Sequence, residues 1–110
     1  MKNENQHYRQ GDVLITRIPS LPKKLTEVTR IDGRLILAHG SATGHSHAIA
    51  SRRCDLFSSA KEPGTLFLRV HGTKAEVTHD EHASITLPKG DYRVSRQREY
   101  SPEAIRQVED

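Results

Sequence analysis

The sequence contains no tryptophan, and aromatic residues make up only 5% of its 110 residues. Because 34% of the residues are hydrophobic, we expect a thin core built mainly from leucine, isoleucine, valine and alanine. The single cysteine, Cys54, excludes an internal disulfide and is expected to be a buried small hydrophobe rather than a reactive thiol. A bound ion or self-association would therefore be the means of strengthening so small a domain.

The sequence also lacks an apolar run long enough to span a membrane, and its first residues lack the apolar stretch of a signal peptide. We therefore expect a cytoplasmic protein that does not contact a membrane. Neither sign of charge is in large excess, because Lys and Arg exceed Asp and Glu by 17 to 14. The opposite charges are interleaved, so a merely soluble surface is a better interpretation than a nucleic-acid footprint.

Short β-branched segments dominate the sequence, and turn residues recur about every ten residues, which is typical of a β-sandwich or barrel. The predicted fold is all-β, a small antiparallel barrel or sandwich, with residues 1–10 as a flexible N-terminal segment and 11–110 as a single β domain. Asp32-Gly33 favours a tight hairpin turn. The predicted strands are residues 13–18, 27–30, 35–39, 45–49, 54–57, 65–70, 74–79, 83–87 and 92–100, with a break at 71–73 and a turn at 88–91.

The tail is the one segment that favours a helix. Ser101 is a good N-cap residue, Pro102 suits the first helical position, and Glu103 is favoured by the helix dipole in the first turn. We therefore expect a short C-terminal helix that must pack against the domain to persist.

Four histidines occur in two short clusters, at residues 45–47 and 79–82. Residues two apart in a strand point to the same side, so His45 and His47 would share a face. Several inward imidazoles without an ion would each need hydrogen-bond partners, in a core that offers few polar donors. The metal ligands that we predict are His45, His47, His79 and His82.

A shell of neutral imidazoles favours zinc, with iron, nickel or copper as alternatives, over magnesium or calcium, which prefer oxygen ligands. Three ligands would leave an open position for a reactive water, whereas four histidines would indicate a closed structural site. Glu81 is the expected general base or orienting partner, and His79 is the second catalytic candidate.

The last predicted strand is rich in arginine. Guanidinium groups bind phosphate or carboxylate bidentately, so this strand could hold an anionic substrate. An edge strand kept soluble by its charges is the competing interpretation. The candidate anion- and substrate-binding residues are Arg93, Arg96, Arg98 and Tyr100.

These features favour a metal-binding protein, and the leading hypothesis is a metal-dependent hydrolase acting on a phosphoester. Its substrate would be a small molecule or a nucleic acid. The alternative is a non-catalytic binding or regulatory module with a structural metal or none. A further alternative is a metal-free nuclease that uses histidine and glutamate. Whether the chain is an enzyme, and whether it forms a homo-oligomer, stays open at this stage.

Several motifs occur in a fixed order from residue 11 to the tail. They are Gly11-Asp12-Val13-Leu14-Ile15, Ala38-His39-Gly40, Ala42-Thr43-Gly44-His45-Ser46-His47-Ala48-Ile49, His79-Asp80-Glu81-His82-Ala83, Leu87-Pro88-Lys89-Gly90-Asp91-Tyr92-Arg93-Val94 and Gln97-Arg98-Glu99-Tyr100. Together they resemble a family of small uncharacterised bacterial and phage proteins, which supplies a pattern and no activity. The residue after Gly40 is usually Glu in that pattern, whereas this sequence has Ser41, so a carboxylate ligand or base there would be lacking.

A looser resemblance is to cupins, in which an H-x-H strand after a glycine-containing loop joins a later histidine to bind a metal inside a β-barrel. The H-x-H element fits. The later cupin element does not, because Pro88-Lys89-Gly90 follows His82 instead of preceding a ligand histidine. The cupin resemblance therefore implies an architecture at most.

Overall fold

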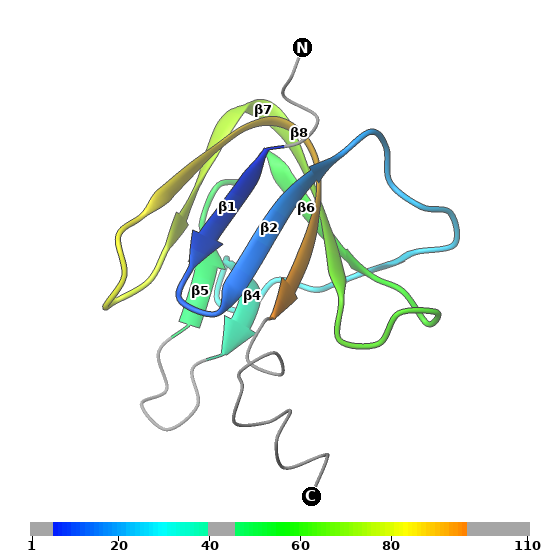
Figure 1. The fold of residues 1–110 in the computed structure, drawn as a ribbon, viewed down its shortest axis with the longest axis horizontal. Coiled ribbons are helices and arrows are strands. Elements are labelled where there is room, and N and C mark those ends of the chain that lie inside the picture. Colours follow the sequence, from blue (N-terminus) through cyan, green and yellow to red (C-terminus); the bar gives the residue numbers. More distant parts are fainter. Residues whose placement is uncertain (1–5, 40–45, 97–110) are drawn as a thin grey trace, which may run out of the picture.

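The structure is a computed structural model that describes residues 6–39 and 46–96. These residues form eight strands and no helix (Figure 1). The strands are β1 (His7–Gln10), β2 (Val13–Ile18), β3 (Thr26–Glu27), β4 (Leu35–His39), β5 (Ser46–Ile49), β6 (Cys54–Ser58), β7 (Leu66–Thr78) and β8 (Ile85–Arg96). All pairings between them are antiparallel, so the prediction of an all-β antiparallel domain is confirmed.

A long bent hairpin, made of β7 and β8, organises the fold. The two strands pair along their length except at a register shift between Val70 and Lys74. Opposite the shift lie Pro88, which cannot donate a ladder hydrogen bond, and Gly90, whose φ of +153° is rarely adopted by other residues. The predicted break at 71–73 and the predicted turn at 88–91 are therefore wrong, because these residues bend two continuous strands instead of ending them.

The bend folds the sheet into two layers, and β1 and β2 lie over β5 and β4 (Figure 1). The first layer contains β1, β2, residues 91–96 of β8, residues 66–70 of β7, β6 and β3, paired in that order. The second layer contains residues 85–88 of β8, residues 74–78 of β7, β5 and β4. Within the described residues no pairing joins β1 to β4, so the sheet is open and is not closed into a barrel.

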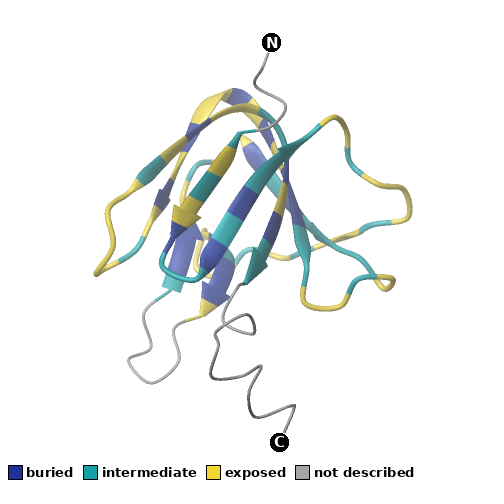
Figure 2. Cartoon of the chain, viewed as in Figure 1, coloured by how far each residue is buried: buried dark blue, intermediate teal, exposed yellow. Residues whose placement is uncertain are grey.

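A cluster of buried, mostly apolar side chains from both layers forms the core. Buried and more exposed residues alternate along the strands (Figure 2). Tyr92 is the largest fully buried side chain, and its hydroxyl donates to the backbone oxygen of Pro88 at 2.6 Å. Cys54 is buried in the core, and this burial raises the pKa of its thiol. The core consists of Val13, Ile15, Leu35, Leu37, Ala38, Ile49, Cys54, Leu56, Leu68, Val70, Ala75, Val77, Leu87, Tyr92 and Val94.

The N-terminal strand β1 corrects the sequence prediction. Residues 7–10 belong to the segment expected to be flexible, yet they pair with β2 from His7↔Thr16 to Gln10↔Val13. Their sequence is too polar to indicate a strand by alternation. Tyr8 nevertheless packs against the core, and Gln10 is only 2% exposed.

The Asp32-Gly33 turn is confirmed, because both residues have positive φ angles of 53° and 79°. The residues that flank this turn, Ile31 and Arg34, form an isolated antiparallel bridge instead of two paired strands. The strand predicted at 27–30 is the shorter β3, which pairs with β6 instead of β4. The expected C-terminal helix lies outside the described residues.

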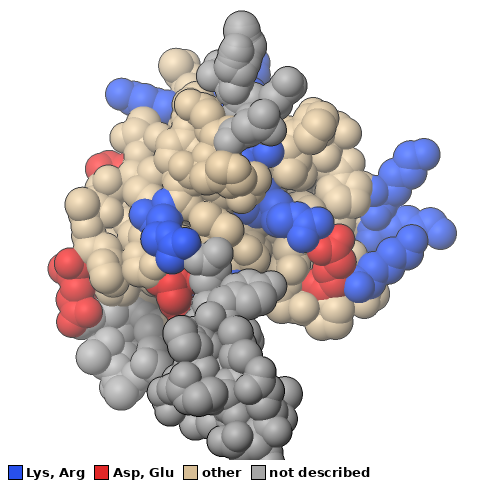
Figure 3. Space-filling view, viewed as in Figure 1, with Lys and Arg blue, Asp and Glu red and all other residues tan. Residues whose placement is uncertain are grey.

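No helix within residues 6–39 and 46–96 is both long and apolar enough to cross a membrane. On the face drawn in Figure 3, Lys and Arg form separate groups, and acidic residues lie beside some of them. Arg69 pairs with Asp91 at 2.9 Å, and Arg93 pairs with Glu62 at 3.0 Å. These pairs agree with the interleaved charges of the sequence.

Candidate functional site

Three of the four predicted ligand histidines lie together at one end of the domain. His47 belongs to β5, and His79 and His82 belong to the loop 79–84 at the tip of the β7–β8 hairpin. The ring centroids are 4.3 Å apart for His47 and His79, 4.8 Å for His79 and His82, and 6.2 Å for His47 and His82. We call these three residues the histidine cluster.

The pairing of β5 with β7 brings the two segments of the histidine cluster together. Ala48 pairs with Thr78, which places the preceding residue of β5 beside the residue that follows β7. In an antiparallel ladder, neighbours of a paired position are themselves opposite each other. His47 and His79 therefore meet although they lie 32 positions apart in the chain (79 − 47).

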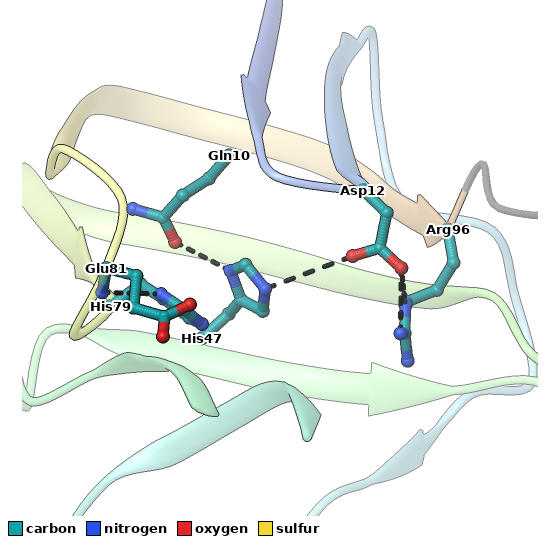
Figure 4. Close-up of polar contacts among 6 residues, drawn as sticks. All are labelled: Gln10, Asp12, His47, His79, Glu81 and Arg96. Atoms are coloured by element: carbon teal, nitrogen blue, oxygen red, sulfur yellow. Dashed lines mark hydrogen bonds and ion pairs between the residues drawn. The ribbon is translucent and has the colours of Figure 1, made fainter. Parts of the chain in front are cut away.

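His47 is the buried member of the cluster, with 4% of its surface exposed, and Gln10 holds its ring. The Gln10 Oε1 atom lies 2.8 Å from His47 Nδ1 (Figure 4). The Gln10 Nε2 group donates to the backbone oxygens of Val77 at 3.1 Å and Ala83 at 2.8 Å. Only the NH₂ end of an amide donates, so these carbonyls fix the amide orientation. Since Oε1 can only accept, His47 carries a proton on Nδ1, and in the neutral ring the lone pair is on Nε2.

Asp12 and Arg96 lie on the other side of the His47 ring (Figure 4). Arg96 donates from Nε and Nη2 to Oδ2 of Asp12 at 3.0 Å and 2.8 Å. The other carboxylate oxygen, Oδ1, lies 4.0 Å from His47 Nε2. Two acceptors therefore face each other, and a cation or a water that donates to both would satisfy them.

The protonation states of Asp12 and His47 follow from this environment. Burial acts to raise the pKa of Asp12, but the hydrogen bond and the charge of Arg96 outweigh it, so the pKa is lowered. Burial is also the main cause that lowers the pKa of His47 to about 4, and His79 adds to this effect while Asp12 opposes it. At pH 7 the site therefore presents an ionised carboxylate and a neutral imidazole. Neutral imidazole is the form that ligates metals.

The loop 79–84 is more exposed than His47. The backbone N–H of Glu81 donates to His79 Nδ1 at 3.0 Å, so a neutral His79 ring carries its proton on Nε2. His82 is exposed and approaches the β1–β2 turn, where a Cβ on Gly11 would stand 2.8 Å from His82 Nε2. Gly11 also has a φ of +61°, so a glycine here suits both the left-handed turn and the close approach of His82.

Within residues 6–39 and 46–96, no group of three or more His, Cys, Asp or Glu side chains is placed so that it could hold a metal ion. The bond from the Glu81 amide to His79 Nδ1 is one physical reason, because it occupies a nitrogen that would otherwise serve as a ligand. His45 and Ser41 lie outside the described residues. The four-histidine ligand set therefore stays a prediction.

The predicted anion-binding residues do not form one group. Arg93 and Arg96 are three positions apart on β8, so their side chains leave opposite faces of the strand. Arg93 pairs with Glu62 and lies over the Phe67 ring at 5.6 Å, whereas Arg96 lies beside the histidine cluster on Asp12. Arg98 and Tyr100 lie outside the described residues.

Sequence reasoning did not identify Gln10 or Asp12 as site residues. Gln10 lies in a polar segment without periodicity, and Asp12 occurs only in the Gly11-Asp12-Val13-Leu14-Ile15 motif, which indicates no chemistry for it. Gln10 reaches the site through hydrogen bonds from β1 to the backbone of Val77 and Ala83, which lie more than 65 positions away in the chain. No local pattern in either segment indicates that contact.

A pocket of about 500 Å³ lies elsewhere, and none of its lining residues belongs to the histidine cluster. Arg30, Cys54 and Asp55 are among the residues that line it. The Arg30 guanidinium already donates to the backbone oxygens of Gly33, Ser51 and Cys54, so its main role is to tie the turn at 31–34 to β6. The chemistry-bearing residues are at the histidine cluster, and we place the candidate site there.

The fold and the site define a small, open, antiparallel β domain with a histidine cluster and an Asp–Arg pair at one end. Residues 9–97 match the family described as a Domain of unknown function (DUF8820), and the chain belongs to this family. Membership of an uncharacterised family is thus confirmed. The match includes the histidine cluster, Gln10, Asp12 and Arg96. Neither curated proteins nor solved structures gave a match.

Proposed function

We propose that this protein binds a divalent transition metal ion, with zinc as the best fit, at the histidine cluster and Asp12, and that the ion supports hydrolysis of a phosphoester. The observation that carries the proposal is the meeting of imidazoles from two distant segments beside an ionised carboxylate. Each of these groups is a common ligand of zinc.

One pair of atoms in the site already has a separation that a single ion could bridge, and the histidine rings lie near the spacing that a shared ion would require. Zinc lies about 2.0–2.2 Å from a nitrogen or oxygen ligand, so two such atoms up to about 4 Å apart can share it. The distance between His47 Nε2 and Asp12 Oδ1 is 4.0 Å. Imidazoles on one tetrahedral zinc have centroids roughly 5 Å apart. The centroid distances of 4.3, 4.8 and 6.2 Å bracket that value.

Binding then requires a local rearrangement of the loop 79–84. The exposed His82 side chain has to rotate, and His79 joins the shell only if it gives up the hydrogen bond from the Glu81 amide. His47 needs no change, because it is buried and its Nε2 lone pair already faces Asp12. In the proposed site, His47 on β5 and Asp12 in the β1–β2 turn are therefore already in position, and the loop 79–84 supplies the remaining ligands after it rearranges.

The surrounding residues suit a hydrolytic site. With His47, His82 and Asp12 as its ligands, the zinc ion would keep an open position, and such an ion lowers the pKa of a bound water to about 7. Glu81, an exposed carboxylate in the loop, would act as the general base. Arg96 lies beside Asp12 and is partly exposed, so its guanidinium would attract the anionic phosphoester.

A second candidate is a non-catalytic module in which the ion is structural. The observation in its favour is the Gln10 amide, which holds both histidine-bearing segments by hydrogen bonds to His47, Val77 and Ala83. A metal-free nuclease is less well supported, because the pKa of His47, at about 4, makes its imidazole a weak base at neutral pH.

The first experiment measures bound metal. The full chain, purified without a histidine tag and supplied with Zn²⁺, is expected to carry about one equivalent by elemental analysis. His47→Ala, His79→Ala and His82→Ala are expected to reduce this content. The matched control is His71→Ala, since His71 is an exposed histidine that pairs with Asp55 at 3.3 Å, away from the cluster. Absence of bound zinc in the wild type, or equal content in His47→Ala, would overturn the proposal.

The second experiment separates the functions. Hydrolysis of bis(p-nitrophenyl) phosphate is expected in the zinc-loaded protein, is expected to stop after chelation, and is expected to fall in Glu81→Gln with zinc content unchanged. Zinc binding without hydrolysis would favour the structural module. Hydrolysis that survives chelation and is lost in His79→Ala would favour the metal-free nuclease and contradict the leading proposal.

A further inference from the structure

We propose that Gln10 is a positioning residue for a cationic ligand, because it determines which nitrogen of His47 faces the site and holds the two histidine-bearing segments together. That the cationic ligand is a metal ion rests on the proposed function. The role of Gln10 in orienting His47 is a property of the metal-free protein as well, so the two can be tested separately.

The first part of the inference follows from the direction of the Gln10 amide. Its NH₂ group donates to the backbone oxygens of Val77 and Ala83, so its oxygen is left to accept from His47 Nδ1. A neutral imidazole in water prefers to carry its proton on Nε2. The bond to Gln10 reverses this preference and places the lone pair on Nε2.

The lone pair on Nε2 decides the class of ligand. His47 Nε2 faces Asp12 Oδ1 at 4.0 Å, so an entering group meets two acceptors and a negative charge. An anion would find no donor at these two acceptor atoms, whereas a cation would be attracted to both. With the opposite tautomer, an N–H of His47 would face the carboxylate and would compete with the cation.

The second part of the inference follows from the three partners of Gln10. His47 belongs to β5, Val77 precedes His79, and Ala83 follows His82. One side chain thus contacts the segments that carry all three histidines of the cluster. Burial of an amide costs free energy that an apolar side chain of similar size would not incur. Packing alone therefore does not account for a glutamine that is 2% exposed.

The test uses the full, metal-free chain labelled with ¹⁵N, because correlation spectra of histidine side chains distinguish a protonated ring nitrogen from one with a lone pair. At pH 7 the wild type is expected to show His47 with its proton on Nδ1. Gln10→Met keeps the size and removes the hydrogen bonds, so the proton is expected to move to Nε2 in part or in full. The matched control is Arg9→Met, since Arg9 is the exposed neighbour on β1. A wild-type proton on Nε2, or an unchanged tautomer in Gln10→Met, would overturn the inference.

A second variant keeps the inference testable if Gln10→Met does not fold. Gln10→Glu supplies an acceptor to His47 but no donor to Val77 and Ala83. Backbone amides of the loop 79–84 are then expected to exchange with solvent faster than in the wild type and in Arg9→Met. Equal exchange rates in all three proteins would show that Gln10 does not hold the loop.

Zinc affinity connects the inference to the proposed function. Loss of a residue that orients a metal-bound histidine typically weakens metal binding about 10- to 100-fold, and this loss is expected for Gln10→Met but not for Arg9→Met. Equal affinities in the two variants would contradict a positioning role. If the wild type binds no zinc, the proposed function fails, while the tautomer measurement still decides whether Gln10 orients His47.

Discussion

Protonation of His47 should destabilise the folded protein as the pH falls. The pKa of histidine is ordinarily 6.5, and in the folded protein that of His47 is about 4, chiefly because the ring is buried. Below pH 6.5 the unfolded chain therefore binds a proton that the folded chain does not. The stability from His47 is fully present above pH 6.5 and is lost as the pH falls toward 4.

The size of this loss follows from the two pKa values. At pH 4 the unfolded chain has bound the proton almost completely and the folded chain about half. At about 1.36 kcal/mol per pKa unit, the stability lost between neutral pH and pH 4 is about 3 kcal/mol. This is a large fraction of the roughly 5–15 kcal/mol that holds a typical domain together.

Other groups also titrate over this range, so the contribution of His47 has to be isolated by comparison. Urea unfolding, followed by far-ultraviolet circular dichroism in the presence of a chelator, gives the free energy of unfolding at about pH 7.5 and pH 4. The wild type is expected to lose about 3 kcal/mol more than His47→Gln, which has no group that titrates there. The matched control is His71→Gln, which removes an exposed histidine away from the cluster. Equal losses in the wild type and His47→Gln would refute the reasoning that burial suppresses protonation of this ring.

Two further predictions concern the packing around the site and the bend. Gly11→Ala and Gly33→Ala both force alanine into a positive φ, and each is expected to cost about 1 kcal/mol in urea unfolding. Of these two variants, only Gly11→Ala is expected to weaken zinc binding as well, because an added Cβ at Gly11 meets the His82 ring and one at Gly33 meets nothing. Equal zinc affinities of the two variants would argue against the contact between Gly11 and His82. Tyr92→Phe removes the hydrogen bond that a fully buried side chain donates to the backbone at the bend, and it is expected to cost about 1–2 kcal/mol by the same assay. Tyr8→Phe removes the hydrogen bond of a more exposed side chain and should cost less. The reverse order would contradict the role given to the Tyr92 hydroxyl.

The sequence predicts the elements whose residues alternate or carry strong turn signals. The strands at 13–18 and 35–39 have the expected bounds, and the Asp32-Gly33 turn has the expected positive φ angles. Periodicity and turn chemistry are local properties, and these features depend on little else. The meeting of His47 with the loop histidines agrees with the prediction that the two histidine clusters share one site, although the pairing of β5 with β7 that brings them together is not a local property.

The remaining features depend on contacts that no local pattern records. Gly90 and Pro88 are typical of a turn, but β7 supplies partners on both sides of them, so they bend a strand instead of ending it. Gln10 is polar and is nevertheless buried, because the loop 79–84 closes over it. Arg93 and Arg96 are close in sequence, yet alternation directs them to different acidic partners.

The bent β7–β8 hairpin has a consequence for folding. One half of each strand belongs to the first layer and the other half to the second, so neither layer is complete until the whole hairpin has formed. The two layers therefore cannot be lost one after the other, and the domain should melt as a single cooperative unit. Spectroscopic probes placed near His47 and near Cys54 would then report the same midpoint of thermal unfolding, although the two residues belong to different layers.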